Sequence, residues 1–190
     1  MTLYSYCLRF DDGAAPNPYW GVCTLVICKP AIRRNVKVGD WVVGLGSKNS
    51  PIGDVSTGVV YAMRVTKVLS MKEYDGFCKR SLTKKIPDWT NSDFRRRVGD
   101  CIYDFSHPGQ PRQRPSVHTA ANRETDLSGL HALLSKHFYY FGDRPRQLPE
   151  YLLPIIHATQ GHKSRSNARH ATKFVRWIES MDRRRNSLLG

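Results

Sequence analysis

The stretch Phe138–Asn167, FYYFGDRPRQLPEYLLPIIHATQGHKSRSN, holds the signals from which the fold can be predicted. Four consecutive aromatic residues open it, and they end a segment, residues 131–141, that favours a strand. Pro149 and Pro154 bracket a short helix over residues 150–156. The polar loop 161–167 then leads into a last helix over residues 168–182, where apolar side chains recur at helical spacing. The stretch therefore predicts a domain that contains both strands and helices.

Toward the N-terminus the pattern changes to strands. Apolar and aromatic residues dominate or alternate over residues 3–10, 21–29, 41–45 and 58–70, and turn residues separate these segments. We predict an α+β fold with a curled, mainly antiparallel sheet or a small β-barrel, flanking helices and a C-terminal helix. One domain is expected over residues 1–190, with a β-rich part (1–105), a mobile loop (106–122), a helix-containing part (123–182) and a basic tail (183–190).

Charge is the outlying property of the composition. The chain has 30 Lys and Arg against 16 Asp and Glu, a net charge of +14 with a pI of about 9.9. Ten Lys and Arg against three Asp and Glu lie between Arg144 and Gly190, and a second basic run covers residues 79–97. Such a balance favours a polyanionic partner, a nucleotide or nucleic acid, through counterion release. The alternative is that these runs are solvated faces of an ordinary basic protein.

Cysteine and histidine spacings favour no metal. The five cysteines form no CxxC pair, and the seven histidines form no HExxH motif. Cys23 and Cys28 lie in a strand-like run at a spacing that points them to opposite faces. The odd cysteine count and the lack of a signal peptide or membrane-length apolar stretch predict reduced thiols, a cytoplasmic protein and no membrane partner. The sequence indicates no particular cofactor.

The loop Gly161–Asn167 is the first candidate ligand site. Backbone N–H groups at the start of the following helix, beside Lys163 and Arg165, suit a phosphate or another anion. An ATPase is excluded because His162 separates the glycine from the lysine that a phosphate loop would require. Either the loop binds an anion, or Ser166 or Asn167 simply caps the helix. The ligand-binding candidates are Asn17, Gly161, His162, Lys163, Ser164, Arg165 and Asn167.

Catalytic and base-stacking candidates are fewer. If the protein is an enzyme, Asp11 and His162 are the acid–base candidates, although a phosphate or base contact without proton transfer is the simpler role for His162. Asp11 and Asn17 flank a stiff loop that forms either a pocket lip or a plain strand connection. Trp20, Trp41 and Tyr61 are candidates for stacking on a base, the alternative being that these rings belong to the core.

Several of these segments together resemble the nucleotide modification associated domain 2 family of bacteria and phages. The likeness is carried by YSYCLRFDDGAAPNPYWGVCTLVICKPAIRR, VGDWVVGLGS, DLSG, LLSKHFYYFGD and GHKSRSN. It implies an association with systems that modify nucleotides or DNA bases, without assigning roles to residues. The residues matching the family's motifs are Asp11, Gly13, Pro16, Asn17, Gly39, Asp40, Gly161, His162, Lys163, Ser164 and Asn167. Residues 37–70 also resemble PUA-like (EVE/ASCH-type) domains, which implies a small PUA-like β-barrel that binds RNA or a modified base.

Three functions remain open on this basis. The first is binding of a nucleotide or nucleic acid, including a modified base, in a DNA modification or defence system. The second is an enzyme that transfers or hydrolyses a group on a nucleotide or DNA base. The third is an accessory protein that docks on a DNA-modification enzyme, for which we expect no intrinsic affinity for nucleotides.

Overall fold

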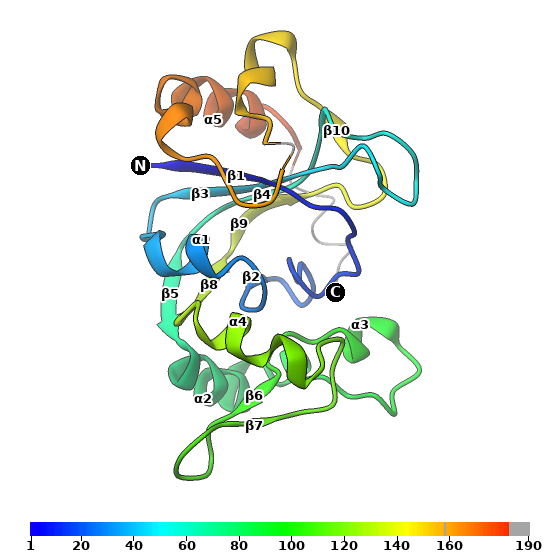
Figure 1. Ribbon diagram of the computed structural model, residues 1–190, viewed down its shortest axis with the longest axis vertical. Coiled ribbons are helices and arrows are strands. Elements are labelled where there is room, and N and C mark those ends of the chain that lie inside the picture. The colour runs from blue at the N-terminus through cyan, green and yellow to red at the C-terminus, as the bar shows by residue number, and fades with distance from the viewer. Residues whose placement is uncertain (158, 183–190) are drawn as a thin grey trace. The chain divides into compact units, whose positions relative to one another are not determined.

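The computed structural model of the chain describes residues 1–157 and 159–182 and separates them into two compact units (Figure 1). The first unit consists of residues 1–11 and 36–66 and the described residues from 135 onward. The second consists of residues 12–35 and 67–134. The basic tail expected over residues 183–190 lies outside the described residues.

A five-stranded sheet forms the centre of the first unit. Its strands are β1 (Leu3–Cys7), β3 (Trp41–Leu45), β4 (Gly58–Arg64), β9 (His137–Tyr140) and β10 (Arg146–Gln147). β1 pairs with β3 in parallel, while β3, β9 and β10 all pair antiparallel with β4. Gly44 is required in β3 because an added Cβ would lie 2.4 Å from the ring of Tyr61. An aromatic side chain of the neighbouring strand therefore fills the space that a side chain at position 44 would need.

Helices cover one face of this sheet. They are the 3₁₀ helices η3 (Glu150–Ile155) and η4 (Arg165–His170) and the α-helix α5 (Ala171–Glu179). The stripe predicted for the last helix is confirmed, since Ala171, Phe174 and Ile178 of α5 are buried together with side chains of the sheet. The short helix and the 131–141 strand segment are also observed, the latter as β8 (His131–Ser135) followed by β9.

The second unit contains two smaller sheets. Strands β2 (Cys23–Leu25), β8 and β5 (Lys67–Ser70) form one in the order β2-β8-β5, and β6 (Tyr103–Asp104) pairs with β7 (Arg112–Gln113). Its helices are α1 (Pro30–Asn35), α2 (Met71–Ser81), α3 (Phe94–Arg97) and α4 (Arg123–Leu127), with 3₁₀ turns η1 (Thr83–Lys85) and η2 (Ala120–Asn122). A separate apolar core lies among these elements.

Two expectations differ from the structure. Residues 58–70 form two strands in different sheets, because Val65 turns back to pair its backbone with Gly39 and Asp40. A helix also begins at Met71, within the part predicted to be β-rich (1–105), where Ser70 and Glu73 form a reciprocal capping box. None of the sheets formed by the described residues closes into a barrel, so the mixed α+β class is confirmed and the PUA-like barrel is not.

Candidate functional site

The loop 161–167 is tied closely to strand β1. Lys163 and Ser5 exchange two backbone hydrogen bonds, of 2.8 and 3.0 Å. Asn167 is fully buried, and its Nδ2 donates to the Leu3 carbonyl at 3.0 Å and to Ser5 Oγ at 2.9 Å. The Lys163 ammonium donates to the carbonyl of Pro154 at 3.1 Å. Asn167 therefore stabilises the loop against the sheet, and its amide donor is used in doing so.

The other residues of that candidate site are distributed as follows. The His162 ring lies 5.7 Å from the Tyr4 ring at a tilt of 41°, Arg165 is exposed, and Ser164 makes no side-chain cap on η4. Asp11 accepts a 2.7 Å hydrogen bond from the hydroxyl of Tyr140 in the same unit. Because η4 is only one short 3₁₀ segment, the helix start expected near Ala168 is not an α-helix N-terminus. Anion binding at this loop stays a prediction.

Asn17 belongs to the interior of the second unit. Its side chain is fully buried, Nδ2 donates to the Val98 carbonyl at 2.9 Å, and Oδ1 accepts from Lys85 Nζ at 2.6 Å. Both ends of the amide are therefore used within the core. The structure places Asn17 in a different unit from Asp11 and His162.

Two of the three stacking candidates are core residues. Trp41 and Tyr61 are 1% and 0% exposed, so their rings offer no free face to a base. Trp20 is half-buried, and the cations of Lys84 and Arg95 lie 4.5 and 4.9 Å from its ring. The alternative that strand aromatics serve the core therefore holds for Trp41 and Tyr61.

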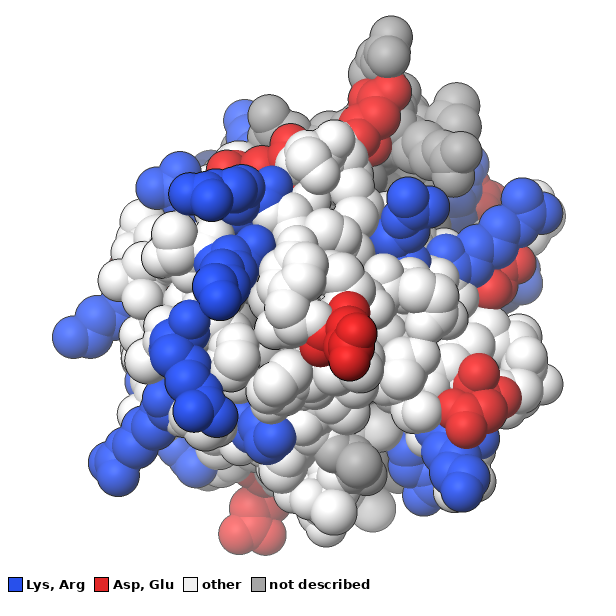
Figure 2. All heavy atoms as spheres, turned by 90° about the horizontal axis from the view of Figure 1, so that it is seen from above, with Lys and Arg blue, Asp and Glu red and all other residues white. Residues whose placement is uncertain are grey.

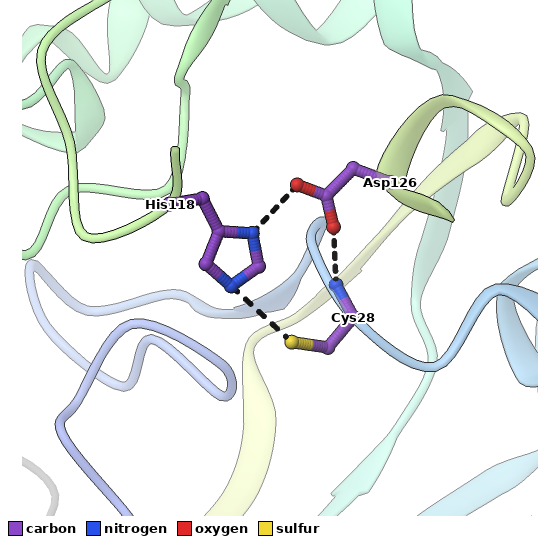
Figure 3. A group of neighbouring side chains, drawn as sticks. All are labelled: Cys28, His118 and Asp126. Carbon is purple, nitrogen blue, oxygen red and sulfur yellow. Dashed lines mark hydrogen bonds and ion pairs between the residues drawn. The ribbon is translucent and has the colours of Figure 1, made fainter. Parts of the chain in front are cut away.

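A different set of side chains has the geometry of a reactive site. Cys28, His118 and Asp126 of the second unit form a linear chain of contacts (Figure 3). The Cys28 sulfur lies 3.5 Å from Nε2 of His118, and Nδ1 of the same ring lies 2.6 Å from Oδ2 of Asp126. The backbone N–H of Cys28 donates to the other carboxylate oxygen at 2.9 Å. A nucleophile, a base and an acid that orients the base are thus connected in order.

Local backbone conformation presents each member. Cys28 lies between β2 and α1 with φ of +61°, a left-handed conformation that is uncommon for a residue with a side chain. Asp126 comes from α4 and is fully buried. His118 comes from the long segment after β7, where its carbonyl accepts hydrogen bonds from Gln113 Nε2 and Ser116 Oγ at 2.9 and 3.0 Å. Cys28 and His118 remain half-buried, so solvent reaches the reactive end of the chain.

Two further side chains hold the cluster in place. The Tyr103 hydroxyl donates to Asp126 Oδ2 at 3.0 Å, and burial together with the Asp126 charge raises the pKa of Tyr103 so that it remains a donor. Arg33 is fully buried, and this burial lowers its pKa to about 10. Its guanidinium donates hydrogen bonds to the carbonyls of Cys28, Asp126 and His131. The carboxylate of Asp126 thus accepts from three separate donors.

The protonation state of His118 follows from its neighbours. Burial of the ring lowers the pKa of His118, but the hydrogen bond to Asp126 and the contact with Cys28 outweigh this and raise it to about 10. The ring is therefore an imidazolium at neutral pH. An imidazolium beside sulfur is the arrangement that stabilises the thiolate in thiol enzymes.

A family model for nucleotide modification associated domain 2 matches residues 1–188. The chain belongs to this family. The family description associates the protein with nucleotide modification, in agreement with the resemblance of its motifs. No curated protein and no solved structure matches the chain. None of the helices in the described part of this family member has the length and apolar character needed to cross a lipid bilayer.

For this family member, residue spacing alone did not reveal the cluster. Cys28 and His118 are 90 residues apart, and His118 lies eight residues before Asp126, ahead of η2 and α4. The available signals were indirect: Lys29-Pro30 ends the strand pattern directly after Cys28, and Asp126 opens the DLSG segment of the family resemblance. His118 lies in the segment predicted as a mobile loop, residues 106–122.

The same three residues also satisfy the distances of a metal site, because one donor atom from each lies within 4.8 Å of the others. Occupancy by a metal would compete with the hydrogen bonds described above. Asp126 already accepts from Cys28 N–H, His118 and Tyr103, and one imidazole nitrogen faces each neighbour. The donors are therefore arranged in sequence along a hydrogen-bonded chain, which favours proton transfer over metal coordination.

Proposed function

We propose that this protein is a thiol-dependent enzyme of nucleotide modification, with Cys28 as nucleophile, His118 as acid–base catalyst and Asp126 as the residue that orients His118. The observation that carries the proposal is the continuous contact from the Cys28 sulfur through both ring nitrogens of His118 to the buried Asp126 carboxylate. Family membership supports a nucleotide, or a base within nucleic acid, as the substrate class.

The proposed reaction is acyl transfer or hydrolysis. The sulfur of Cys28 attacks the carbonyl carbon of an acylated substrate and forms a C–S bond, while the bond to the leaving group breaks. His118 Nε2 gives its proton to that leaving group. Water or an acceptor amine then attacks the thioester, returns a proton to His118 and releases the thiolate. Atoms and charges balance without any further reactant.

Three residues, Asp126, Tyr103 and Arg33, contribute to this reaction by holding Cys28 and His118 in place. The buried carboxylate keeps the proton of His118 on Nδ1, which leaves Nε2 directed at sulfur. Tyr103 donates a further hydrogen bond to Oδ2, the same Asp126 oxygen that contacts His118. Arg33 holds the Cys28 carbonyl at 2.8 Å and so stabilises the unusual backbone conformation at the nucleophile.

The first test compares the reactivity of two cysteines in one protein. Cys7 and Cys28 are the two half-buried cysteines, and Cys23, Cys78 and Cys101 are buried, so Cys7 is the matched control. Iodoacetamide at pH 7, with alkylation mapped by mass spectrometry, is expected to modify Cys28 before Cys7. In His118→Asn this preference should disappear, while Cys7→Ser should leave the Cys28 rate unchanged. Equal rates at Cys7 and Cys28 in the wild type would overturn the proposal.

The second test addresses acyl transfer. The activated ester p-nitrophenyl acetate should acetylate Cys28, and His118→Asn should slow the reaction by roughly a hundredfold or more, since a hundredfold is the lower end of the usual range for general acid–base catalysis. Addition of nucleotides one at a time should protect Cys28 if they occupy the substrate site. Zn²⁺ is included as a separate arm: stoichiometric protection that EDTA reverses would favour a metal site instead.

A further inference from the structure

A second feature of the molecule lies in the first unit, around Trp177 of α5. This side chain lines three adjoining surface hollows. The first two have volumes of about 560 and 460 Å³, within the usual range of ligand sites. Phe141 lines one hollow and Tyr151 lines another, so aromatic side chains lie on both sides of Trp177.

The rims of these hollows are cationic. Arg144 and Arg146 border the first hollow, Lys173 and Arg176 border the second, and all four side chains are exposed. Within residues 1–157 and 159–182, no acidic side chain forms an ion pair with any of the four. Among the described residues that line these three hollows, Asp182 is the one acidic residue. The face in Figure 2 shows Lys and Arg gathered in a row along one edge of the surface, with acidic side chains fewer and scattered.

The aromatic residues Tyr151 and Trp177 are accessible at the surface. Tyr151 is 52% exposed, which is high for a large aromatic side chain. Trp177 is half-buried and packs against the core residue Phe174, with ring centroids 5.8 Å apart. The contact with Phe174 therefore fixes the orientation of the Trp177 ring. Binding at such a platform loses little side-chain freedom.

Aromatic side chains edged by exposed cations match one class of partner best. Single-stranded nucleic acid offers exposed base faces for stacking and a phosphate chain for the cations. A duplex hides its base faces and would use the cations alone. An acidic protein surface would use the cations but would leave the exposed Tyr151 ring without a stacking partner.

We infer that the surface formed by Phe141, Arg144, Arg146, Tyr151, Lys173, Arg176 and Trp177 binds single-stranded nucleic acid. The four cations contact phosphates, and Tyr151 and Trp177 stack on bases. This inference does not depend on the thiol site, because every residue named belongs to the first unit, whereas Cys28, His118 and Asp126 belong to the second.

The test is fluorescence anisotropy with labelled oligo(dT) and oligo(U) over a salt series, using the full chain. Arg144→Gln/Arg146→Gln and Lys173→Gln/Arg176→Gln should each weaken binding about tenfold at low salt. Each pair should also lower the slope of log K against log salt by about 1.4, since each phosphate contact to a single strand contributes about 0.7. Tyr151→Ala should weaken binding about tenfold or more without changing the slope, because stacking carries about 1–3 kcal/mol per base.

The matched control is Lys72→Gln/Arg80→Gln, which removes two exposed cations of α2 in the second unit. This variant should bind nearly as the wild type does. Equal losses for the control and the surface variants would show that only net charge matters and would overturn the inference. Tighter binding of duplex than of single strands, with no effect of Tyr151→Ala, would do the same.

Two measurements separate this inference from the proposed enzyme. Cys28→Ser should retain full affinity for oligo(dT), so loss of catalysis leaves the binding result intact. The surface variants should retain the wild-type rate of Cys28 alkylation when no nucleic acid is present.

Discussion

Lys85 shows at the scale of one residue how a charge is accommodated in this protein. It is fully buried, and its ammonium group donates to four oxygens: the carbonyl and Oδ1 of Asn17, the Val22 carbonyl and Thr24 Oγ1. Burial lowers the pKa of Lys85, and the nearby Asp100 charge opposes this. Tyr74 and Thr24 in turn donate to Asp100 at 2.6 and 2.5 Å. The network explains why Asn17 is an interior residue.

Lys85→Met is therefore expected to be strongly destabilising. The substitution leaves Oδ1 of Asn17 without its donor and removes the cation near buried Asp100. Removing one partner from a buried set of charges in this way costs about 3–5 kcal/mol. Urea unfolding followed by circular dichroism measures the loss. Lys72→Met, an exposed site, is the control and should change stability by less than about 0.5 kcal/mol. A loss of similar size at both positions would contradict this account of the network.

His118 makes a second prediction, on pH. Its folded pKa of about 10 lies above the ordinary value of 6.5, so folding stabilises the protonated form. That stabilisation is complete below pH 6.5 and is lost as pH rises toward 10. The free energy of unfolding of the wild type should therefore fall over this window relative to His118→Gln, as measured by urea unfolding at several pH values. A constant difference between the two proteins would show that His118 is not held protonated.

At the scale of elements, the junction between α4 and β8 positions the thiol site. Gly129 follows α4, and an added Cβ there would lie 2.2 Å from the guanidinium of buried Arg33. That guanidinium is fixed by carbonyls of Cys28 and His131 and cannot move aside without losing them. The small residue at Gly129 thus allows Arg33 to brace the backbone on both sides of the reactive cluster.

Gly129→Ala is expected to destabilise the protein by about 1–3 kcal/mol through overpacking. It should also slow alkylation of Cys28, because displaced Arg33 no longer holds the Cys28 carbonyl. The matched control is Gly76→Ala inside α2, where the nearest atoms belong to the end of the Arg80 side chain and the gain in helix propensity is about 1 kcal/mol. Opposite signs for the two substitutions are the expected result, and equal effects on stability would argue against the contact with Arg33.

At the scale of the whole molecule, the chain enters each unit more than once. The second unit is assembled from residues 12–35 and 67–134, which are separated by two strands of the first unit. Strand β2 of the first segment pairs with β8 of the second, and Lys85 finds all its acceptors in the first segment. Neither segment can complete its core or its polar network alone. The chain divides into two compact units, and whether both belong to the single domain predicted over residues 1–190 stays a prediction.

A fragment experiment follows from this organisation. Residues 67–134 alone should be unfolded by circular dichroism and amide NMR dispersion, because Lys85 would lack its acceptors. Residues 12–35 joined to 67–134 by a Gly/Ser linker of about eight residues should fold. Such a linker is long enough at about 3.4 Å per residue, since Arg33 and Met71 are in contact near the two ends to be joined. Cooperative folding of 67–134 alone would show that this division into units is wrong.

Much of the fold could be predicted from local patterns. The alternation of apolar residues located β1, β3 and β4, and the spacing of Ala171, Phe174 and Ile178 predicted the buried stripe of α5. The capping box of Ser70 and Glu73 that begins α2 is equally local, because its two residues are three positions apart. These features are local because each depends on a few consecutive residues and on the period of one strand or helix.

The sequence by itself determined the family, the mixed α+β class, the basic character and most strands. Only the tertiary structure decided which polar residues meet. Cys28, His118 and Asp126 converge because β2, the segment after β7 and α4 pack in one unit, while Asn17, Trp41 and Tyr61 are enclosed in cores. The physical reason is that periodicity specifies which side of an element faces inward, whereas contacts between distant residues depend on how the elements pack together.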